Sequence, residues 1–460
     1  MEIVRSARDR FFLLNPPFYR KILRDYYCCT VSKAGYLWHP IDLLVQSGIL
    51  GKSGTVAVLD AVAQRASHKS VVRTATDYLP TAVFCLVGSL SIETDAIILK
   101  EIKEKTGATI VVSGDACLEN PEEFLDKRDF IDAILFDFTS SDIVRLATGD
   151  FESADSSAFR RNGKIEVVRT RKMKEFEYPV PDHEAFEKKN YNMPLVPESF
   201  NTVLASFGCP YFCAFCNSGA LSPGFSFRNH ENMMEEIASL YSRGARHIFF
   251  KDMTFGVDSA RVERLCRALA NEATSITWHA YTRLDLLDER RIEMYSESGC
   301  RLLQIGIETS DKDIGRSMGK EVDIERAREA FNLMRKKGII PGAHFILGLP
   351  GESAKSAFLT AVAAVRLDPG YASFNVFDPR PGSKLCEIDH AVGDVSLTTR
   401  LVTRFAYALF YLRPRKVFYL ARNLSLKRSL VSFAEAVRSF LFMPVSSRGR
   451  ARRKAARLED

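Results

Sequence analysis

Cys209-Pro-Tyr-Phe-Cys213-Ala-Phe-Cys216 is the stretch around which this 460-residue chain is organised. Its C-x3-C-x2-C spacing lets three thiolates meet at one point without a fourth protein ligand. A structural zinc site has four ligands, whereas an iron–sulfur cluster held by three thiolates leaves one iron open. The alternative is three buried or unrelated cysteines, which such close clustering disfavours. The spacing predicts an iron–sulfur site with an open iron, next to the aromatic ring of Phe215.

The cysteine loop follows the first of six strand-like segments between residues 199 and 385. These segments are apolar and are separated by helical stretches: Thr202–Ser206, His247–Lys251, Ile276–Tyr281, Leu302–Ile307, Ala343–Leu347 and Ser373–Phe377. Asp258 and Asp323 are expected to cap helix starts, and Gly244, Gly299 and Gly338 to end helices. The repeat predicts a partial (β/α)6 TIM-type barrel with active residues at the carboxyl ends of its strands.

Residues 1–150 also alternate between short apolar runs and helical segments, which favours an α/β, Rossmann-like parallel sheet. The expected strands are Phe11–Asn15, Val56–Leu59, Ala82–Gly88, Thr109–Ser113 and Ala133–Phe136, and the expected helices are Ile92–Thr106 and Pro121–Lys127. Ligands of such sheets lie beyond the carboxyl ends of the strands. Ser89, Ser91 and Gly114 occupy turns at these ends, although taken singly such residues are more often ordinary turn residues.

Two further segments complete the predicted organisation. Residues 151–198 are polar and interrupted by prolines, and they are expected to form a linker that includes a hairpin turn at Asn162-Gly163. Residues 386–460 are expected to form a helical, basic C-terminal region. Between residues 404 and 457 there are fourteen Lys or Arg and one acidic residue, Glu435, which points to contact with an anionic surface such as a membrane.

Composition limits the class of protein. A hydrophobic fraction of 46% and a charged fraction of 26% are those of a soluble globular protein. No run of about 18 apolar residues suggests a membrane span, and the first residues lack a signal-peptide pattern. Ten scattered cysteines without an export signal indicate reduced thiols and a cytoplasmic location.

The cysteine loop, with an aromatic residue directly before its third cysteine, resembles that of the radical S-adenosylmethionine (radical SAM) superfamily. Four later segments resemble strand ends of the same superfamily in the same order. They are Phe249–Phe255, Gln304–Thr309, Ala343–Glu352 and Asp378–Leu385. The order of five segments over residues 199–385 makes this resemblance specific.

Within that superfamily the chain resembles the B12 (cobalamin)-binding radical SAM proteins, because a parallel-sheet domain beginning Leu13-Leu14-Asn15-Pro16-Pro17 precedes the barrel. The C-terminal Phe410-Tyr-Leu-Arg-Pro414 is also similar. The chain departs from the pattern in three places. Val62 stands where the cobalt-ligating histidine of the mutases lies, Gly114-Asp115 replaces a Gly-Gly pair, and Phe207 replaces a common arginine before Gly208.

The resemblance implies a chemistry. Cys209, Cys213 and Cys216 would hold a [4Fe–4S] cluster at which S-adenosylmethionine is reductively cleaved to a 5′-deoxyadenosyl radical, for cobalamin-dependent methylation of an unactivated carbon. The resemblance assigns S-adenosylmethionine contacts to Phe215, Asp252, Arg283, Glu308, Ile346 and Gly348, and cobalamin contacts to Ser89, Ser91 and Gly114. For Arg283, an ordinary ion pair with Asp285 or Asp288 is a competing interpretation. A flavodoxin or ferredoxin would supply the electron.

Two alternatives stay open at this point. The first is a cobalamin-independent radical SAM enzyme for cyclisation, rearrangement or oxidation. The second is a nucleic-acid-binding protein with a metal-stabilised loop and a basic tail. A methylthiotransferase is disfavoured because the cysteines of the first domain lack the spacing for a second cluster. The sequence does not select among a small natural product, a lipid or a peptide as substrate.

Overall fold

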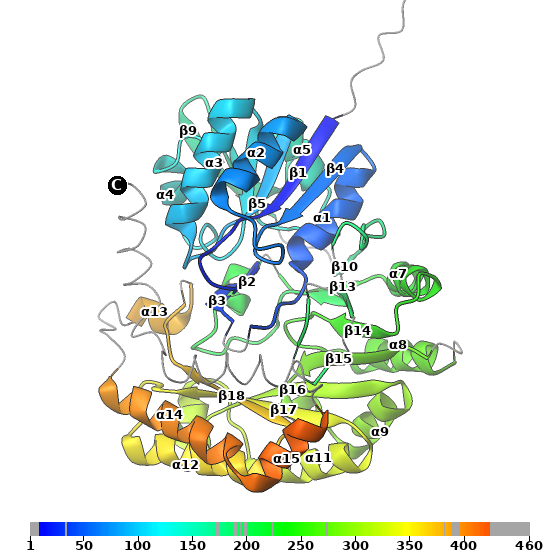
Figure 1. Cartoon of the computed structure of the whole chain (residues 1–460), viewed down its shortest axis with the longest axis vertical. Coiled ribbons are helices and arrows are strands. Elements are labelled where there is room, and N and C mark those ends of the chain that lie inside the picture. The colour runs from blue at the N-terminus through cyan, green and yellow to red at the C-terminus, as the bar shows by residue number, and fades with distance from the viewer. Residues whose placement is uncertain are drawn as a thin grey trace, which may run out of the picture.

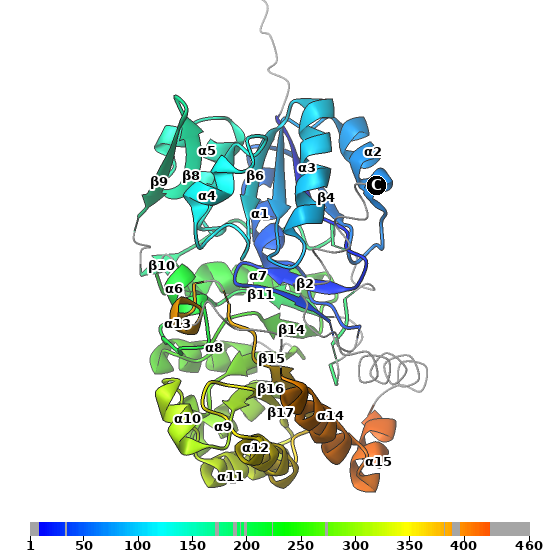
Figure 2. The same cartoon turned by 90° about the vertical axis from the view of Figure 1, so that its left-hand side faces the viewer.

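The structure is a computed structural model that describes residues 9–32, 35–170, 174–186, 191–193, 195–196, 200–222, 224–271, 275–380, 382–388 and 396–423. Two α/β domains are stacked along the long axis of the molecule (Figures 1 and 2). The first domain contains a seven-stranded sheet, and the second contains a six-stranded parallel sheet with helices outside it.

The first sheet has the strand order β4-β1-β5-β6-β7-β8-β9, and the pairs from β4 to β7 are parallel. Its strands are β1 (Asp9–Asn15), β4 (Gly54–Asp60), β5 (Ala82–Leu86), β6 (Thr109–Ser113), β7 (Ala133–Leu135), β8 (Ser156–Arg161) and β9 (Lys164–Arg169). Its helices are α1 (Ile41–Gly51), α2 (His68–Tyr78), α3 (Ile92–Thr106), α4 (Pro121–Asp126) and α5 (Asp142–Ala147). The predicted Rossmann-like domain is confirmed by this parallel strand order. Its strands are continuous apolar runs because helices cover both faces of a parallel sheet.

The first sheet extends beyond residue 150. Strands β8 and β9 lie in the range that the sequence assigned to a linker, yet they pair antiparallel with β7 and with each other. The turn between them is Asn162-Gly163, with φ values of 48° and 77°. Positive φ at both central residues is the geometry that makes Asn-Gly a hairpin signal. The hairpin was therefore expected from the sequence, whereas its addition to the first sheet was not.

A second hairpin, β2 (Ile22–Asp25) with β3 (Cys28–Val31), was not expected from the sequence. It lies between the first sheet and the barrel, as Figure 2 shows for β2. Its first strand is completely buried although it contains Arg24 and Asp25. Buried charges in a strand break the hydrophobic pattern by which strands are recognised.

The second domain is an open barrel of six parallel strands in the order β11-β14-β15-β16-β17-β18. The strands are β11 (Asn201–Val203), β14 (His247–Phe250), β15 (Thr277–Thr282), β16 (Cys300–Glu308), β17 (Ile340–Leu347) and β18 (Tyr371–Val376). The connecting helices are α7 (His230–Ser242), α8 (Ser259–Asn271), α9 (Glu289–Glu297), α10 (Lys312–Ser317), α11 (Ile324–Lys336) and α12 (Ala354–Leu367). Strands β11 and β18 are the two ends of this sheet, so the predicted partial barrel is confirmed.

Local signals in the sequence set the ends of the barrel helices. The Asp258 carboxylate accepts a hydrogen bond from the Arg261 N–H, and Asp323 caps α11 through two backbone N–H groups. Gly244, Gly299 and Gly338 have φ values of 87°, 91° and 78°, which L-residues with a Cβ rarely adopt. Each of these three helix ends lies only a few residues before the next strand, so the strand begins at a defined position.

Smaller elements surround the barrel mouth. Strands β10 (Glu175–Phe176), β13 (Ser226–Arg228) and β12 (Ser206–Phe207) form a three-stranded sheet, and α6 (Ser218–Leu221) follows the cysteine loop. Helices α13 (Lys384–Ile388), α14 (Leu397–Tyr411) and α15 (Pro414–Asn423) form the C-terminal extension, of which residues 424–460 lie outside the described residues. No helix in the described ranges is long and apolar enough to cross a bilayer.

Candidate active site

The cysteine loop begins directly after β12, at the carboxyl end of the first barrel strand. Gly208 has a φ of 85°, and a Cβ there would lie 2.3 Å from the Gly224 carbonyl oxygen, so this turn requires glycine. Two backbone hydrogen bonds hold the loop, from the Ala214 N–H to the Met318 carbonyl at 2.9 Å and from the Leu385 N–H to the Ala214 carbonyl at 3.1 Å. Contacts on both sides fix the loop against the barrel.

Each of the three cysteine sulfurs has a polar neighbour. Thr254 Oγ1 lies 3.6 Å from Cys209 Sγ, Arg283 Nη1 lies 3.5 Å from Cys213 Sγ, and the Ser218 hydroxyl lies 3.3 Å from Cys216 Sγ. Burial raises the pKa of all three thiols, while the charge of Arg283 lowers those of Cys209 and Cys213. Such donors stabilise bound thiolates and tune the potential of an iron–sulfur cluster.

In the described part of the chain, no three His, Cys, Asp or Glu side chains are grouped as the ligands of one metal ion. In a [4Fe–4S] cube each thiolate binds a different iron. Three cysteines in one loop, each with a hydrogen-bonding neighbour, stay the predicted ligands of such a cube.

Arg283 connects the cysteine loop to a cavity. Its guanidinium forms a bidentate ion pair with Asp285, with closest distances of 2.8 and 2.9 Å, and stacks over the Tyr211 ring at 3.9 Å. Asp285 is thus its partner, whereas Asp288 caps α9. A cavity of about 220 Å³ lies beside it, lined by Arg283, Leu284, Asp285, Lys320, Glu321, Val322, Asp323 and Arg326.

Glu308 is held at the end of β16 by Lys320. The Glu308 carboxylate lies 2.7 Å from the Lys320 ammonium, and both side chains are nearly buried. A bulge between Gly306 and Glu308 and a φ of 63° at Glu308 turn this carboxylate out of the regular strand. Non-glycine residues at positive φ often mark functional sites, because the strain must be offset elsewhere.

The remaining residues assigned to S-adenosylmethionine take different positions. Asp252 is buried and accepts hydrogen bonds from the Ala205 N–H at 2.8 Å and the Ser206 hydroxyl at 2.7 Å. Burial raises the pKa of Asp252 to about 6, although these two hydrogen bonds lower it. Phe215 and Ile346 pack against one small apolar cluster, formed by Ala214, Ile314, Met318, Leu349 and Phe377.

Gly348 follows β17 with a φ of 85°, and its N–H donates to the Glu352 carboxylate. A Cβ at this position would lie 2.8 Å from Thr399 on α14. Glycine is therefore required where the C-terminal extension crosses the loop after the fifth barrel strand.

Ser89, Ser91 and Gly114 lie together at the carboxyl edge of the first sheet. Ser89 and Ser91 already make hydrogen bonds within the protein. Ser89 donates from its N–H and its hydroxyl to the Asp115 carboxylate, both at 2.8 Å. Gly114 has a φ of 118°, and a Cβ there would lie 2.2 Å from the Val87 carbonyl oxygen. The predicted turns thus form one compact edge that is built from glycine and hydroxyl side chains.

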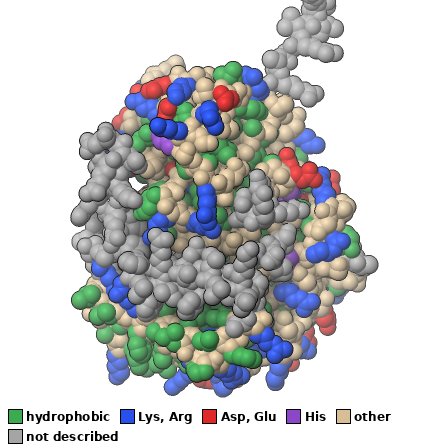
Figure 3. Space-filling view, viewed as in Figure 1, with side chains coloured by type: hydrophobic (Ala, Val, Ile, Leu, Met, Phe, Trp, Pro, Cys, Tyr) green, Lys and Arg blue, Asp and Glu red, His purple; other side chains and the backbone are tan. Residues whose placement is uncertain are grey.

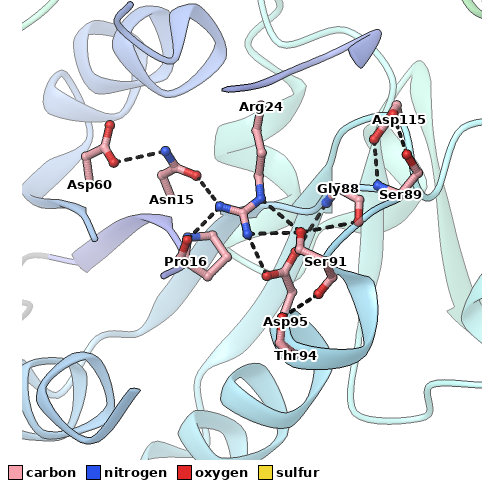
Figure 4. Close-up of polar contacts among 10 residues, drawn as sticks. All are labelled: Asn15, Pro16, Arg24, Asp60, Gly88, Ser89, Ser91, Thr94, Asp95 and Asp115. Atoms are coloured by element: carbon pink, nitrogen blue, oxygen red, sulfur yellow. Dashed lines mark hydrogen bonds and ion pairs between the residues drawn. The ribbon is translucent and has the colours of Figure 1, made fainter. Parts of the chain in front are cut away.

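The centre of this edge is the buried guanidinium of Arg24, which comes from the unpredicted β2 strand (Figure 4). It donates to the Asp95 carboxylate at 2.8 Å, the Ser91 hydroxyl at 2.9 Å and the Asn15 side-chain oxygen at 2.8 Å. A further donation reaches the Pro16 carbonyl at 2.6 Å. Arg24 therefore joins the hairpin to the turns after β1 and β5.

Among the described residues, several buried polar atoms at the same edge have no hydrogen-bond partner. They are both carboxylate oxygens of Asp42, the Gln46 side-chain oxygen and the hydroxyl oxygens of Ser113, Ser156 and Ser157. Asp42, Gln46 and Ser113 line a narrow slot between α1 and the ends of β5 and β6, which is too tight to admit a water molecule. Burial raises the pKa of Asp42 to about 8. Unsatisfied buried polar groups are costly and commonly mark a ligand site.

Asp60 and Val62 show why histidine ligation of cobalt does not arise here. The Asp60 carboxylate accepts hydrogen bonds from Asn15, Ala63 and Tyr191, each at 2.9 Å. Val62 is buried and offers no ligand atom. The segment is structural, so a cobalamin at this edge would lack a histidine from the mutase-type motif.

The carboxyl edge of the first sheet faces the carboxyl end of the barrel. Lys251, at the end of β14, pairs with Asp25 of the β2–β3 hairpin at 3.1 Å, and both side chains are buried. The Arg380 guanidinium, after β18, donates to the Cys29 carbonyl at 3.1 Å. The cysteine loop joins this contact, because the Asn217 side chain donates to the Tyr27 carbonyl at 3.0 Å.

The space between the two domains is lined by aromatic rings. Lys251 Nζ lies 4.9 Å from the centre of the Trp38 ring and 5.9 Å from that of Tyr281. Burial raises the pKa of Tyr281 and of Tyr371, which lie at the same contact between the domains. His279 lies deeper, stacked on Phe249 with ring centres 4.3 Å apart.

Comparison with known proteins identifies the second domain. The sequence profile of the radical SAM superfamily matches residues 203–358, which include the cysteine loop and four complete barrel strands, β14 to β17. This match covers about a third of the chain and supports an enzyme rather than a nucleic-acid-binding module with a metal-stabilised loop.

Similarity to curated relatives extends over both domains. The uncharacterized methyltransferase PH0819 of Pyrococcus horikoshii is 25% identical over 409 residues, covering 82% of this chain and 88% of the relative. The anaerobic magnesium-protoporphyrin IX monomethyl ester cyclase of Rubrivivax gelatinosus is 23% identical, covering 76% of this chain and 66% of the relative. Methyltransferase and cyclase thus both occur among the names of its relatives.

The fold of this chain is similar to that of TsrM from Kitasatospora setae, a radical S-adenosylmethionine methyltransferase solved with cobalamin and a [4Fe–4S] cluster. The two structures superpose with a TM-score of 0.64 at 16% identity, covering 85% of this chain and 76% of TsrM. The similarity confirms the predicted fold class, a parallel-sheet domain followed by a partial (β/α)6 barrel.

Some site residues were not found from the sequence. Thr254 and Ser218 contact the cysteines, Lys320 holds Glu308, and Arg24 with Asp95 holds the first-domain edge. Ser218 lies only two residues after Cys216, so a hydroxyl next to a cysteine triplet was an available signal. Lys320 and Arg24 come from segments without a recognisable pattern, and only the fold brings them to the site.

Proposed function

We propose that this protein is a cobalamin-dependent radical SAM methyltransferase that methylates an unactivated carbon. The observation that carries the proposal is the cysteine loop, whose three sulfurs each have a polar neighbour and which faces the carboxyl edge of the first sheet. A cofactor at that edge and a radical generated at the loop would meet where the two domains face each other.

Cys209, Cys213 and Cys216 would hold the cluster as thiolates. Arg283 and Lys320 would balance part of its negative charge, because both lower the pKa of Cys213 against the effect of burial. Phe215 would shield one side of the cluster from water, since its ring belongs to the apolar cluster under the loop. Exclusion of water protects reactive intermediates from side reactions.

Polar groups around the open side of the cluster suit S-adenosylmethionine. Glu308, held by Lys320, would accept hydrogen bonds from ribose hydroxyls, and Asp252 would accept one from the methionyl ammonium. Arg283 would approach the methionyl carboxylate, because its guanidinium is 3.5 Å from Cys213. Ile346 and Gly348 would border the adenine, where a side chain at residue 348 has no room.

The carboxyl edge of the first sheet suits cobalamin, which carries many amide groups. Ser89, Ser91 and Gly114 form the compact turn region. In the described part of the chain, no hydrogen-bond donor reaches the side-chain oxygens of Asp42, Gln46 and Ser113. An amide-bearing ligand would supply such donors. The cobalt would carry no histidine from this domain's mutase-type segment, because Val62 occupies that position.

When bound, the cluster and S-adenosylmethionine supply a 5′-deoxyadenosyl radical, and methylcobalamin supplies the methyl group. The chain's own task is to position these groups, to keep water out and to prevent the radical from reaching other hydrogen donors. A flavodoxin or ferredoxin in the cytoplasm would deliver the electron. The substrate class remains a small natural product, a lipid or a peptide.

Anaerobic purification and reconstitution test the proposal. The wild-type protein should contain about four iron and four sulfide per chain and should form 5′-deoxyadenosine from S-adenosylmethionine and a reductant. A Cys216→Ala variant should lose both, whereas Cys266→Ala, a buried cysteine on α8, should retain both. A wild-type protein that binds one zinc and leaves S-adenosylmethionine intact would contradict the proposal.

Product mass separates methylation from the second candidate, which the similarity to a cyclase favours. Methylation adds one methylene to the substrate, whereas cyclisation or oxidation adds none or removes hydrogens. Equilibrium dialysis with hydroxocobalamin tests the cofactor independently. Absence of stoichiometric cobalamin binding would leave a cobalamin-independent radical SAM enzyme.

A further inference from the structure

Exposed apolar side chains gather on one face of the C-terminal half. Of the eleven large hydrophobic side chains that are exposed in the described part of the chain, eight lie on or next to α12, α14 and α15. They are Phe358, Leu359, Leu397, Leu401, Phe405, Leu412, Val417 and Phe418, and they are called the apolar face below. Figure 3 shows hydrophobic side chains in green over these helices in the lower part of the molecule.

The apolar face is not the side of α14 that the fold requires. Leu397, Leu401, Phe405 and Leu412 recur at intervals of four, four and seven residues, which places them on one side of a helix. Their exposures reach 70% at Leu397. The opposite side of α14 is the buried one, with Thr403, Ala406 and Phe410 turned toward the barrel. Helix α14 therefore presents apolar side chains outward as well as inward.

The face is rigid and continuous between helices. The rings of Phe405 on α14 and Phe358 on α12 are stacked with centres 5.5 Å apart. Helix α14 is fixed to β18 by the hydroxyl groups of Tyr407 and Tyr411, which bond to the backbone of Phe374 and Ala372. A monomeric protein rarely keeps such a patch unless it binds something.

The charged side chains within the three helices have one sign. Helices α12 and α14 each contain two Lys or Arg, α15 contains three, and none of the three helices contains Asp or Glu. Lys355, Arg366, Arg415 and Arg422 are exposed. A face that combines apolar side chains with cations alone matches a surface that is apolar inside and anionic at its edge. The interface of an anionic bilayer has this composition.

Charge also argues against two other occupants. Residues 424–460, which follow α15 directly, contain nine Lys or Arg and three acidic residues, so this segment would bring cations to a cationic face. A second copy of the chain in a two-fold contact would place the same cations against each other. An anionic bilayer instead attracts both the face and the following basic segment.

We propose that the apolar face of α12, α14 and α15 docks this protein on the surface of an anionic lipid bilayer. The apolar side chains enter the interfacial region while the surrounding Lys and Arg contact lipid headgroups. Because α14 covers β18, one end of the open barrel, docking brings the open side of the barrel close to the lipid. This position favours a lipid among the substrate classes, a consequence that rests on the proposed function, whereas docking itself does not.

Vesicle sedimentation of the full-length protein tests docking without any cofactor. We expect the wild type to bind vesicles of phosphatidylcholine mixed with phosphatidylglycerol, and to bind pure phosphatidylcholine vesicles at least tenfold more weakly. Leu401→Asp with Phe405→Asp should weaken binding by on the order of a hundredfold. Leu79→Asp, an exposed leucine of the first domain, should bind like the wild type.

A second variant leaves the apolar side chains in place. Arg415→Glu with Arg422→Glu should weaken binding to the anionic vesicles by about tenfold or more and reduce its dependence on salt. Circular dichroism and thermal unfolding establish that the variants fold. If Leu401→Asp with Phe405→Asp left vesicle binding unchanged, the proposal would be overturned, because the segment after residue 423 would then be sufficient for binding. A wild-type dimer that this variant dissociates, or no vesicle binding at all, would overturn it equally.

Discussion

The Glu308 carboxylate lies 2.7 Å from the Lys320 ammonium, at the carboxyl end of the fourth barrel strand. The pair exists because the strand contains a bulge, and because residue 306 has no side chain. A Cβ on Gly306 would lie 2.2 Å from the Glu308 carboxylate oxygen Oε1 and 2.4 Å from Lys320 Nζ. Gly306 and Lys320 are thus both needed to position the Glu308 carboxylate near the cysteine loop.

Gly306→Ala should therefore weaken binding of S-adenosylmethionine without unfolding the protein. The added Cβ displaces the Glu308–Lys320 pair, and the loss of one charge-assisted hydrogen bond is worth about 1.5–3 kcal/mol, or about tenfold to a hundredfold in affinity. Isothermal titration of the anaerobically reconstituted enzyme measures it. Gly51→Ala is the control, because a Cβ there meets nothing within 4 Å. Unchanged affinity in Gly306→Ala would remove Glu308 from the binding site.

The barrel and its cysteine loop could be predicted because their signals are local. Each strand is a short apolar run, each helix has its cap, and the three cysteines lie within eight residues. The helix Ile92–Thr106 was predicted to the residue. The β2–β3 hairpin could not be predicted, since Arg24 and Asp25 are charged residues in a completely buried strand. Their partners, Asp95 and Lys251, lie 71 and 226 residues away in the sequence.

Arg24→Met should destabilise the first domain. It leaves Asp95 in a fully buried position without its cation, which typically costs about 3–5 kcal/mol. Burial already raises the pKa of Asp95 to about 6 with the cation present. Urea unfolding measures the loss, and dialysis with hydroxocobalamin should show weaker binding because Ser91 loses the hydrogen bonds that it accepts from Arg24. Adding Asp95→Asn to Arg24→Met should restore part of the stability, and a double variant no better than Arg24→Met would contradict this account.

Asp42 should make stability depend on pH in the absence of a ligand. Its folded pKa of about 8 lies above the ordinary value for Asp, which is about 4. The folded protein therefore retains a proton that the unfolded chain releases, so the free energy of unfolding decreases as the pH rises from about 4 to 8. The expected slope is about 1.4 kcal/mol per pH unit.

Asp42→Asn should reduce the slope by the contribution of Asp42, about 1.4 kcal/mol per pH unit, and make the protein more stable than the wild type at pH 8. Asp95 and Asp252, whose pKa burial raises to about 6, should keep a smaller dependence below pH 6. Urea unfolding at a series of pH values measures both effects. Asp126→Asn, an exposed carboxylate at the end of α4, is the matched control and should keep the slope of the wild type. Equal stabilities of Asp42→Asn and the wild type at pH 8 would show that the Asp42 carboxylate is satisfied in solution.

Tyr407 and Tyr411 should hold the C-terminal extension to the barrel. The Tyr411 hydroxyl accepts from the Ala372 N–H at 3.0 Å and donates to the Ala372 carbonyl at 2.7 Å, and Tyr407 does the same with Phe374 at 3.1 Å. Two side chains thus occupy hydrogen-bonding positions along the end strand β18, which would otherwise offer its edge to another chain.

The double variant Tyr407→Phe with Tyr411→Phe removes both hydroxyls but keeps both rings. Its free energy of unfolding should decrease by about 1–3 kcal/mol for each pair of buried backbone groups left without a partner. It should also aggregate faster on heating, because the edge of β18 is then exposed. Thermal unfolding followed by light scattering measures both. Tyr241→Phe on α7 controls for loss of a tyrosine hydroxyl elsewhere. An unchanged unfolding temperature would mean that packing of Thr403, Ala406 and Phe410 alone holds α14 in place.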